Sequence, residues 1–522
     1  MRKEEPTWVP FLDWNDVFAG HMGYTDDGRQ VLQDGASGVR LGVQAAEKSG
    51  PFFQRERPWE ALSLGFVCIL FDEGRYRMWY RASPSPDDRG IAAEHKVEAD
   101  GNVTYTCYAE SGDGVQWERP ELGLCEYGGS RRNNILFPGN YLGIGSVVCD
   151  PSAPESERYK TIHFGTEWRI DEERVSAEAF REFWANVGED EDAREEARKR
   201  ARTGHVLQGA VSADGIHWER LTEPLLGPSR WAFDTQNVLV FDAEAGRYEV
   251  YVRGRVGVYH YGRRAVRRSR SSDFRRGWSE PELVLTAQPH DAVDEDIYTP
   301  AYSRYPGGKY HLMFPSIYHR ASDVIDIHLA VSRDGLNWVR PGTGPIVDRG
   351  AGDEGGRQFG TMYAGPGLLP LGEERWGLAY AANWHNHNEY GALLQSHRPA
   401  PDGEFWWAKW KRDRLVAVEA PTLGHFSVSQ RPCAGKQLLV NCQTERGGWL
   451  QFELLDGTYN RKNVEAGPAY AGYSFADCDP LRGDLLAHEV TWRGKSDLSG
   501  FAGKSVLMRV KMARAKLFAL AI

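Results

Sequence analysis

Short apolar segments recur along the chain, and each is followed by a turn and then by a segment that opens with a basic and an aromatic residue. Residues 66–70 (Phe-Val-Cys-Ile-Leu) and 237–241 (Asn-Val-Leu-Val-Phe) are two of the leading segments. The segments that follow the turns begin at Arg75, Arg158, Arg247, Lys309 and Arg375. Apolar runs of about four to eight residues bounded by Gly, Pro and Asp are typical of buried β-strands. The pattern therefore predicts five copies of one antiparallel unit.

A second repeat supplies the turns of these units. Ser-x-Asp-Gly-x-x-Trp occurs at residues 111–117, 212–218 and 332–338, and a longer copy without the glycine occupies residues 271–278. Asp-Gly provides the positive φ of a tight hairpin turn, and the Ser and Asp side chains can bond to amides of the turn. Since a third strand leads into each turn and a fourth leaves it, the sequence predicts four strands in each unit.

Radially repeated four-stranded sheets are how a β-propeller protects its strand edges. We therefore predict an all-β chain whose residues 51–412 form a five-bladed β-propeller. The alternative is a set of unrelated hairpins in an ordinary sandwich, which the constant order of the repeated elements disfavours. Residues 413–522 show longer alternating strands, which predict a C-terminal β-sandwich. Residues 1–50 lack the repeat and are expected to form an N-terminal arm between the two domains.

One segment departs from the all-β pattern. Residues 171–203 are rich in Glu, Arg and Ala, and their apolar side chains, among them Phe180, Phe183 and Trp184, recur at helical spacing. We expect a short helical insertion in blade two. Two interpretations stay open for it: a solvated helix on the rim, or a lid that shields the pocket from water.

The composition narrows the class of partner and the compartment. The net charge of −10 over 522 residues argues against nucleic acid, whose binding needs a positive surface. No stretch approaches the ~18 apolar residues of a membrane-spanning helix, so no membrane partner is expected. The charged N-terminus has no apolar stretch behind it and the seven cysteines form no Cys-x-x-Cys pair, which predicts a cytoplasmic protein with reduced thiols. A secreted protein whose leader had been removed would show the same pattern, and the oligomeric state stays open.

The order of the strands also predicts which face of the propeller holds the pocket. If the innermost strand of each blade comes first, its start shares one face, called the pocket face, with the connection from the second to the third strand. The Ser-x-Asp-Gly turns then lie on the opposite face and are structural. The candidate site residues on the pocket face are the carboxylates Glu60, Asp234 and Asp296 and the substrate-binding side chains Trp59, Arg253, Arg255, Tyr298, Tyr318, Tyr363, His385 and His387.

Carboxylates that converge on one axis among aromatic and basic side chains suit the cleavage of a glycosidic bond. One carboxylic acid protonates the leaving oxygen while a second carboxylate attacks the sugar or activates water. Aromatic rings stack on sugar C–H faces, and Arg or His bonds to hydroxyls. Asp296 is the expected acid, because Asp294 and Glu295 beside it form a like-charge cluster that favours protonation. Asp234 is expected to stay ionised, and Glu60 to be the nucleophile or base.

The four-stranded units, the Ser-x-Asp-Gly-x-x-Trp turns and the C-terminal strands resemble the five-bladed β-propeller glycoside hydrolases, which include the arabinanase/β-xylosidase and invertase/levansucrase groups. The chain looks most similar to uncharacterised bacterial proteins related to the invertase N-terminal domain. The resemblance implies an enzyme that cleaves oligo- or polysaccharides, furanosides among them, with a first-blade Asp and two later carboxylates in its site. Asp234 and Asp296 match the later two, but Glu60 stands where those families have Asp. This departure leaves the nucleophile and the retaining or inverting outcome open.

Two other functions stay open. A non-catalytic carbohydrate-binding propeller would keep the aromatic residues but would need no carboxylate pair. A sialidase-like hydrolase has a similar turn, but that turn carries an extra residue between Asp and Gly, and that fold has more blades. No cofactor is required by the expected chemistry, and His385 and His387 favour hydrogen bonding over metal binding. The acidic runs at residues 294–296 and 353–354 could hold a structural calcium ion.

Overall fold

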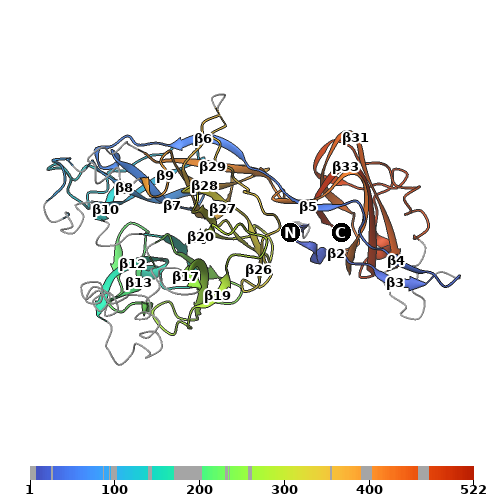
Figure 1. The fold of residues 1–522 in the computed structure, drawn as a ribbon, viewed down its shortest axis with the longest axis horizontal. Helices are drawn as coiled ribbons and strands as arrows, with labels where there is room; N and C mark the ends of the chain where they lie inside the picture. The colour runs from blue at the N-terminus through green and yellow to red at the C-terminus, as the bar shows by residue number, and fades with distance from the viewer. Residues whose placement is uncertain are drawn as a thin grey trace.

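The computed structural model describes residues 8–24, 27–85, 87–92, 95, 103–138, 144–169, 203–229, 233, 235–256, 262–352, 356–389, 402–456 and 469–522. Within these ranges the elements with assigned bounds are β-strands and three-residue 3-10 helices, which confirms the all-β prediction for the described chain. The strands gather in two lobes (Figure 1). The 3-10 helices are η1 (Trp14–Asp16), η2 (Pro58–Glu60), η4 (Glu155–Glu157) and η5 (Ser499–Phe501).

Three small antiparallel sheets follow one another in the larger lobe, each with its strands in chain order. The first contains β7 (Ser63–Asp72), β8 (Arg75–Ser83), β9 (Tyr105–Ser111) and β10 (Ile135–Pro138). The second contains β11 (Ser146–Cys149), β12 (Tyr159–Arg169), β13 (Thr203–Ser212) and β14 (Trp218–Arg220), with β15 (Leu226–Ser229) beside β13. The third contains β16 (Val238–Asp242), β17 (Arg247–Val256), β18 (Arg263–Ser271) and β19 (Glu282–Leu285). These strands therefore fall on the repeated apolar segments of the sequence.

The next group of strands is interrupted halfway along its length. One half contains β20 (Glu295–Thr299), β23 (Ser316–His319) and β24 (Val324–Ile327). Its other half is a separate sheet of β21 (Tyr302–Arg304), β22 (His311–Met313), β25 (Ala330–Ser332) and β26 (Trp338–Val339). Pro300 and Pro315 stand between the halves, where a residue without an N–H interrupts the ladder of hydrogen bonds. These strands are called the β20–β26 group.

The last group of the larger lobe is completed by a strand from the other end of the chain. β27 (Thr361–Pro370), β28 (Arg375–Asn383) and β29 (Glu404–Lys411) pair in order, and β6 (Glu47–Phe53) joins the free edge of β29. The register sets Phe53 opposite Phe405. A single parallel pair between β24 and β27 links this β27–β6 group to the preceding one. The added strand removes an open edge, which is the weak point of a sheet.

The smaller lobe is one seven-stranded sheet with long central strands. It contains β30 (Val416–Pro432), β31 (Leu439–Asp456), β33 (Ser505–Ala521) and β32 (Asp484–Glu489), together with β1 (Val9–Pro10), β2 (Val17–Phe18) and β5 (Arg40–Val43). A separate hairpin consists of β3 (His21–Tyr24) and β4 (Gln30–Gln33). Phe426, Phe452 and Val510 are fully buried in the core of this sheet. The first 53 residues thus contribute strands to both lobes, and the domain limits at residues 50 and 412 stay predictions.

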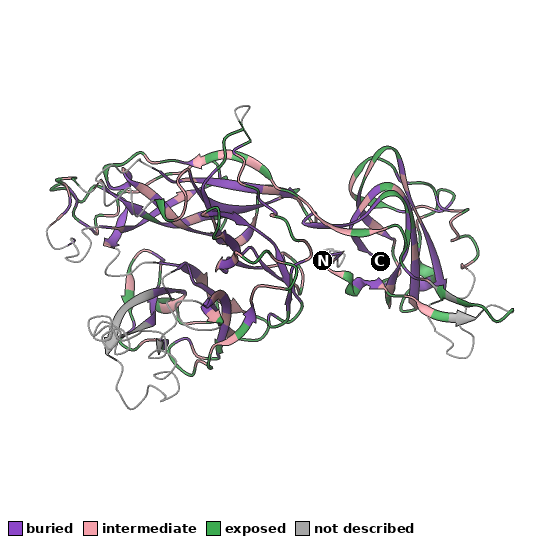
Figure 2. Cartoon of the chain, viewed as in Figure 1, coloured by how far each residue is buried: buried purple, intermediate pink, exposed green. Residues whose placement is uncertain are grey.

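Apolar side chains between neighbouring sheets form a closed circuit in the larger lobe. Trp79 of the first sheet packs with Tyr159 of the second, and Tyr251 of the third packs with Met313 of the β20–β26 group. The circuit closes where Trp407 of β29 lies in the same core as strands of the first sheet. Figure 2 shows buried positions on the strands throughout this lobe. Sheets that pack face to face around a ring form a propeller-like arrangement.

The repeated Ser-x-Asp-Gly turns have the local bonds that their sequence predicts. In the first copy, the Gly114 amide donates to Ser111 Oγ at 2.9 Å, and two further amides donate to Asp113 Oδ1 at 2.8 Å. The φ angle of Gly114 is 75°, a left-handed value that glycine adopts without strain. The copies at residues 212–218 and 332–338 repeat these bonds.

The glycine carbonyl of each of these turns joins two sheets. Gly215 O accepts the indole N–H of Trp218 at 3.0 Å and that of Trp79, in the first sheet, at 2.8 Å. Gly114 O in the same way accepts Trp117 at 3.2 Å and Trp407 at 2.8 Å. In the third copy, the carbonyl of Gly335 accepts Trp338 at 3.0 Å and Tyr251 Oη at 3.3 Å. These contacts give the turns a structural role between sheets.

Some expectations fall outside the described residues. The helical insertion expected at residues 171–203 finds no support there, because only its last residue, Thr203, is described, and that residue begins β13.

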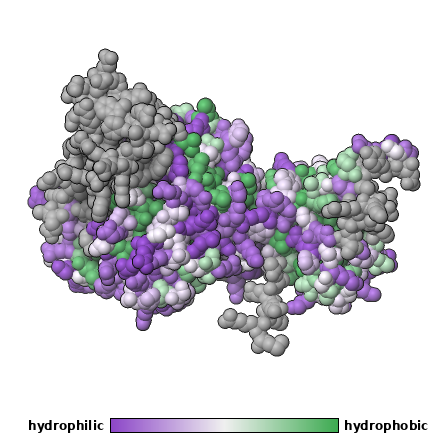
Figure 3. Space-filling model, turned by 90° about the horizontal axis from the view of Figure 1, so that it is seen from below, coloured by the Kyte–Doolittle hydropathy of each residue, from purple (hydrophilic) through white to green (hydrophobic). Residues whose placement is uncertain are grey.

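Where the chain is described, no helix combines the length and apolar character needed to cross a bilayer. All seven cysteines are described as free thiols, six of them buried. The described surface on the face drawn in Figure 3 is mainly hydrophilic.

We predict that Gly215→Ala destabilises the protein more than Gly246→Ala does. Both glycines have positive φ (75° and 60°), so alanine costs about 1–2 kcal/mol at either position. At Gly215 a Cβ would also lie 2.9 Å from Cζ2 of Trp79, whereas at Gly246 nothing lies within 4 Å. Overpacking against a buried indole adds about 1–3 kcal/mol. Thermal unfolding midpoints of both variants measure the difference, and equal midpoints would contradict the bridging role of the turn.

Candidate functional site

Four aromatic side chains from different strands meet around Tyr298. Tyr298 lies on β20, Tyr318 on β23 and Tyr363 on β27, and His387 follows the end of β28. The ring centroid of His387 is 4.8 Å from those of Tyr298 and Tyr318, and the Tyr363 centroid is 5.8 Å from that of Tyr298. The structure therefore brings together four of the side chains that the sequence places on the pocket face.

Two guanidinium groups from the third sheet cover these rings. Cζ of Arg253, on β17, lies 4.4 Å from the ring centroid of Tyr298, and Cζ of Arg264, on β18, lies 4.9 Å from it. Arg253 is a predicted site residue and is almost completely buried. A cation this close to an aromatic face is attracted by the ring quadrupole. The six side chains of this and the preceding paragraph are called the Tyr298 cluster.

Asp296 is surrounded by donors. Its Oδ1 accepts the backbone N–H of Arg264 at 2.7 Å, and its Oδ2 accepts Arg264 Nη1 at 2.8 Å and Arg320 Nη2 at 2.5 Å. The carboxylate is fully covered. Asp294 accepts the backbone amide of Ala321 at 3.1 Å, and Glu295 Oε1 lies 3.9 Å from His319 Nδ1. The contacts suit a carboxylate that holds two arginines and do not favour its assignment as the acid.

A turn between β23 and β24 ties the Tyr298 cluster to the loop after β28. Asp323, in this turn, accepts the hydroxyl of Tyr318 at 2.9 Å and the side-chain amide of Asn388 at 2.6 Å. The backbone N–H of His387 donates to Asp323 O at 2.9 Å. Asp323 has a φ of 58°, which is uncommon for a residue with a side chain and is tolerated best by Asp and Asn. The carboxylate of Asp323 therefore holds Tyr318 and Asn388, and its backbone carbonyl holds His387.

The environment keeps the histidine of the cluster neutral. Burial, with the guanidinium of Arg264 beside it, lowers the pKa of His387 to about 4. Burial also raises the pKa of Tyr363, whose hydroxyl lies 3.3 Å from Nδ1 of His387. Near pH 7 the site thus presents the neutral imidazole of His387 and the protonated phenols of Tyr318 and Tyr363 beside the two guanidinium groups. Such groups can donate to and accept from sugar hydroxyls.

The structure places other predicted site residues elsewhere. Glu60 is fully buried: its Oε1 accepts Tyr80 Oη at 2.6 Å and Arg119 Nε at 2.9 Å, and its Oε2 accepts the amide of Glu56 at 2.9 Å. The indole of Trp59 donates to Asn134 Oδ1 at 3.0 Å. These bonds make Glu60 an anchor of the first sheet, and they do not favour its expected role as nucleophile or base.

His385 and Arg255 also have partners outside the Tyr298 cluster. His385 Nδ1 pairs with Asp402, and Arg255 Nη1 donates to the carbonyl of Gly262 at 3.3 Å. Asp234 lies outside the described residues, as does the acidic pair at residues 353–354. The catalytic assignment of Asp234 and the calcium site expected at 353–354 therefore stay predictions.

Sequence reasoning missed several residues that position the cluster. Arg264, Arg320, Asp323 and Asn388 do not belong to the predicted set, although they bond to its members. The pair Arg263-Arg264 at the start of a third strand was a usable signal, because that strand begins on the pocket face. Asp323 carried no such signal, since a polar residue in a short turn is ordinary.

Comparisons with known proteins give distant structural similarity only. No family model and no curated protein matches the sequence. An N-acetylgalactosamine deacetylase from F. plautii is 15% identical over 73% of this chain and 97% of that chain, with a TM-score of 0.38. A GH32 beta-fructofuranosidase of Bombyx mori is 8% identical over 92% and 93%, with a TM-score of 0.37. A family 43 arabinoxylan arabinofuranohydrolase from Bacillus subtilis is 10% identical over 90% and 99%, also with a TM-score of 0.37. Similarity this distant carries no argument about activity.

The lowered pKa of His387 predicts a pH dependence of stability. The pKa is about 4 in the folded protein against 6.5 ordinarily, so the unfolded chain binds more protons between these values. Stability therefore falls as the pH falls from about 6.5 to about 4, and His387→Gln should reduce this loss. Burial likewise lowers the pKa of His311 to about 4. Part of the stability loss should therefore remain in His387→Gln, because His311 still contributes to it.

Thermal unfolding midpoints across this pH range test the effect. His488→Gln, on β32 of the smaller lobe, is the control for removing an exposed histidine. If the wild type and His387→Gln lose stability equally on acidification, His387 is not held neutral by the fold.

Proposed function

We propose that this chain is a glycoside hydrolase whose substrate binds against the Tyr298 cluster. The observation that carries the proposal is the convergence of three tyrosines and a neutral histidine from the β20–β26 and β27–β6 groups with two arginines from the third sheet. Aromatic faces suit the C–H surfaces of a sugar ring, and guanidinium and imidazole groups suit its hydroxyls. An oligo- or polysaccharide is the substrate class that combines both kinds of surface.

The same proposal includes a five-bladed propeller. The three small sheets are its first three blades, the interrupted β20–β26 group is the fourth, and the β27–β6 group is the fifth. The closed circuit of apolar interfaces supports this count. The innermost strands would then be β7, β11, β16, β20 and β27, which puts Tyr298 and Tyr363 on inner strands of adjacent blades.

The contacts of Glu60 and Asp296, two of the three predicted carboxylates, suggest how the roles divide. Glu60 and Asp296 are fully covered, and both oxygens of each accept hydrogen bonds. We assign Asp296 to the support of Arg264 and Arg320, where its charge balances theirs. Asp234 is the remaining candidate for direct reaction with the sugar, as proton donor, nucleophile or base.

A carbohydrate-binding propeller without catalysis is the second candidate. The observation in its favour is that Asp296 and Glu60 are engaged in structural bonds, so the described residues include no predicted carboxylate with an open oxygen. An aromatic cluster with basic residues is sufficient for binding alone. The variants below separate the two functions.

We predict that Asp234→Asn lowers kcat/KM for glycoside cleavage by at least about a hundredfold, because loss of a group in general acid–base catalysis commonly costs about 10²–10⁴-fold. Asp296→Asn should also reduce activity, since a neutral amide cannot hold two guanidinium groups. Asp294→Asn is the matched control, because that carboxylate bonds only to a turn amide among the contacts described. Rates on panels of aryl furanosides and pyranosides are the measurement.

Rescue experiments identify the role of Asp234. Azide should restore cleavage to Asp234→Gly if the carboxylate is the nucleophile or base, and activated leaving groups should restore it if Asp234 is the acid. Wild-type rates for Asp234→Asn would remove it from the mechanism. The protein is a binding module if the wild type binds oligosaccharides but cleaves nothing in either panel, and if Tyr298→Ala no longer binds them.

A further inference from the structure

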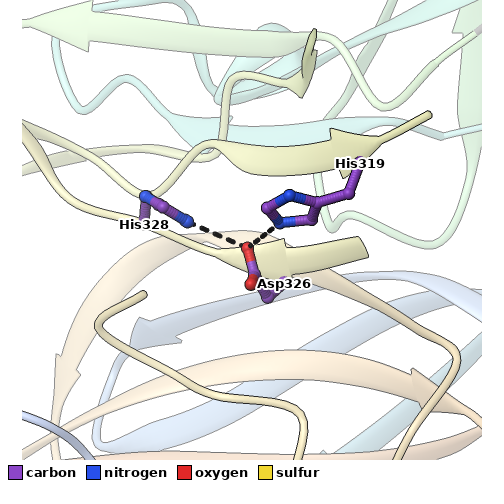
Figure 4. Close-up of side chains that lie close together, drawn as sticks. All are labelled: His319, Asp326 and His328. Carbon is purple, nitrogen blue, oxygen red and sulfur yellow. Dashed lines mark ion pairs between the residues drawn. The ribbon is translucent and has the colours of Figure 1, made fainter. Parts of the chain in front are cut away.

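A second group of polar side chains lies on the opposite face of the strands that carry the Tyr298 cluster. In the register of β23 and β24, Ile317 stands opposite Asp326. His319 is two residues from Ile317 and His328 is two residues from Asp326, so these side chains share one face of the sheet. Tyr318 points to the other face. The His319, Asp326 and His328 side chains converge in Figure 4.

We propose that His319, Asp326 and His328 bind one divalent transition-metal ion. Nε2 of His319 lies 3.1 Å from Asp326 Oδ1, and Nε2 of His328 lies 2.9 Å from the same oxygen. The three atoms all lie within 4.8 Å of one another. A histidine nitrogen and a carboxylate oxygen that each lie about 2.1 Å from a common ion, and 2.9–3.1 Å from each other, subtend an angle of roughly 90° at the ion, as in octahedral or five-coordinate sites.

The orientation of the imidazoles supports a shared ligand. All three atoms are buried, and within the described chain none of them has a hydrogen-bond partner of acceptable geometry, although the two N···O separations are short. The Nε2 atom of each ring is therefore close to the carboxylate oxygen, but the N–H direction does not point at that oxygen. A buried polar atom without a hydrogen bond is costly, and one ion would satisfy all three at once.

The donor set selects the class of ion. Two imidazoles and one carboxylate suit Zn²⁺, Mn²⁺, Fe²⁺ or Co²⁺, whereas Ca²⁺ and Mg²⁺ prefer oxygen ligands throughout. His328 is 1% exposed, and His319 is partly open to solvent, so water can complete the coordination on the His319 side. Glu295 Oε1 lies 3.9 Å from His319 Nδ1, close to where a carboxylate would orient a ligating histidine.

Arg340 opposes metal binding at His328. Its Nη2 donates to Nδ1 of His328 at 2.6 Å, so that nitrogen is an acceptor in this structure. A histidine that ligates through Nε2 carries its proton on Nδ1 and donates it to a neighbour. Arg340 must therefore release His328 when the ion binds. Asp291, which accepts Arg340 Nη1 at 2.5 Å, and Glu295, 3.9 Å away, can retain the guanidinium.

An ion at this place would connect to the Tyr298 cluster through one turn. His319 and Asp326 flank residues 320–323, which contain Arg320, a partner of Asp296, and Asp323, a partner of Tyr318. Joining both ends of the turn through a metal would hold these two side chains in place. The metal site is nevertheless independent of the proposed hydrolase activity, because its binding can be measured directly.

The test uses the full chain after removal of bound metal with a chelator. We expect calorimetric titration with ZnCl₂, MnCl₂ or CoCl₂ alone to show one equivalent bound by the wild type for at least one of these ions. Asp326→Asn and His319→Gln should each weaken binding at least about tenfold. Arg340→Gln should tighten it, because the side-chain carbonyl of glutamine can accept from Nδ1 of His328.

His217→Ala is the matched control, since His217 and Asp214 form an exposed pair at 2.7 Å without a third ligand. Circular dichroism confirms that each variant is folded. Binding that is absent from the folded wild type up to millimolar metal would overturn the proposal, even if Arg340→Gln binds. Wild-type affinity in both Asp326→Asn and His319→Gln would also overturn it, and so would the loss of binding in His217→Ala.

Discussion

The larger lobe depends on one contact, in which a glycine carbonyl accepts two donors. The carbonyl of Gly215 receives an indole N–H from its own sheet and another from the neighbouring sheet, and Gly114 does the same. The φ of 75° at Gly215 is one that glycine adopts without strain, and a Cβ at this position would lie 2.9 Å from Cζ2 of the buried Trp79 ring. In the copy at residues 271–278, Phe274 stands in place of the glycine that follows Asp, and its ring packs against Tyr248 within the apolar core.

Fixing the angle between neighbouring sheets is what allows a site to be assembled from several of them. Arg253 comes from the third sheet, Tyr298 from the β20–β26 group and Tyr363 from the β27–β6 group. Cζ of Arg253 lies 4.4 Å from the ring centroid of Tyr298, and the Tyr363 centroid lies 5.8 Å from it. A small rotation of one sheet would separate them. The repeated turns hold neighbouring sheets in place, and the Tyr298 cluster depends on that placement. β6 adds the last strand of the larger lobe by pairing with β29.

Local patterns were sufficient to predict the strands and turns, because apolar segments and Asp-Gly act over a few residues. The order of the strands, from which the pocket face was predicted, also indicated Tyr298, Tyr318, Tyr363, His387 and Arg253. It could not show which polar residues have structural partners. Glu60 is occupied by Arg119, a residue 59 positions away, and such a pairing leaves no mark in the local sequence. The acidic run 294–296 shows another limit of local patterns: neighbouring residues on a strand point to opposite faces, so charges adjacent in the sequence need not share partners.

The same alternation explains how one pair of strands can serve two sites. Asp296 and Tyr318 stand opposite each other in the register of β20 and β23, and so do Glu295 and His319, one step along. The first pair faces the Tyr298 cluster, and the second faces the proposed metal ligands. The two sites share no side chain, yet they share the turn at residues 320–323. Any force that fixes His319 and Asp326 must therefore also restrict Asp323, whose carboxylate holds Tyr318.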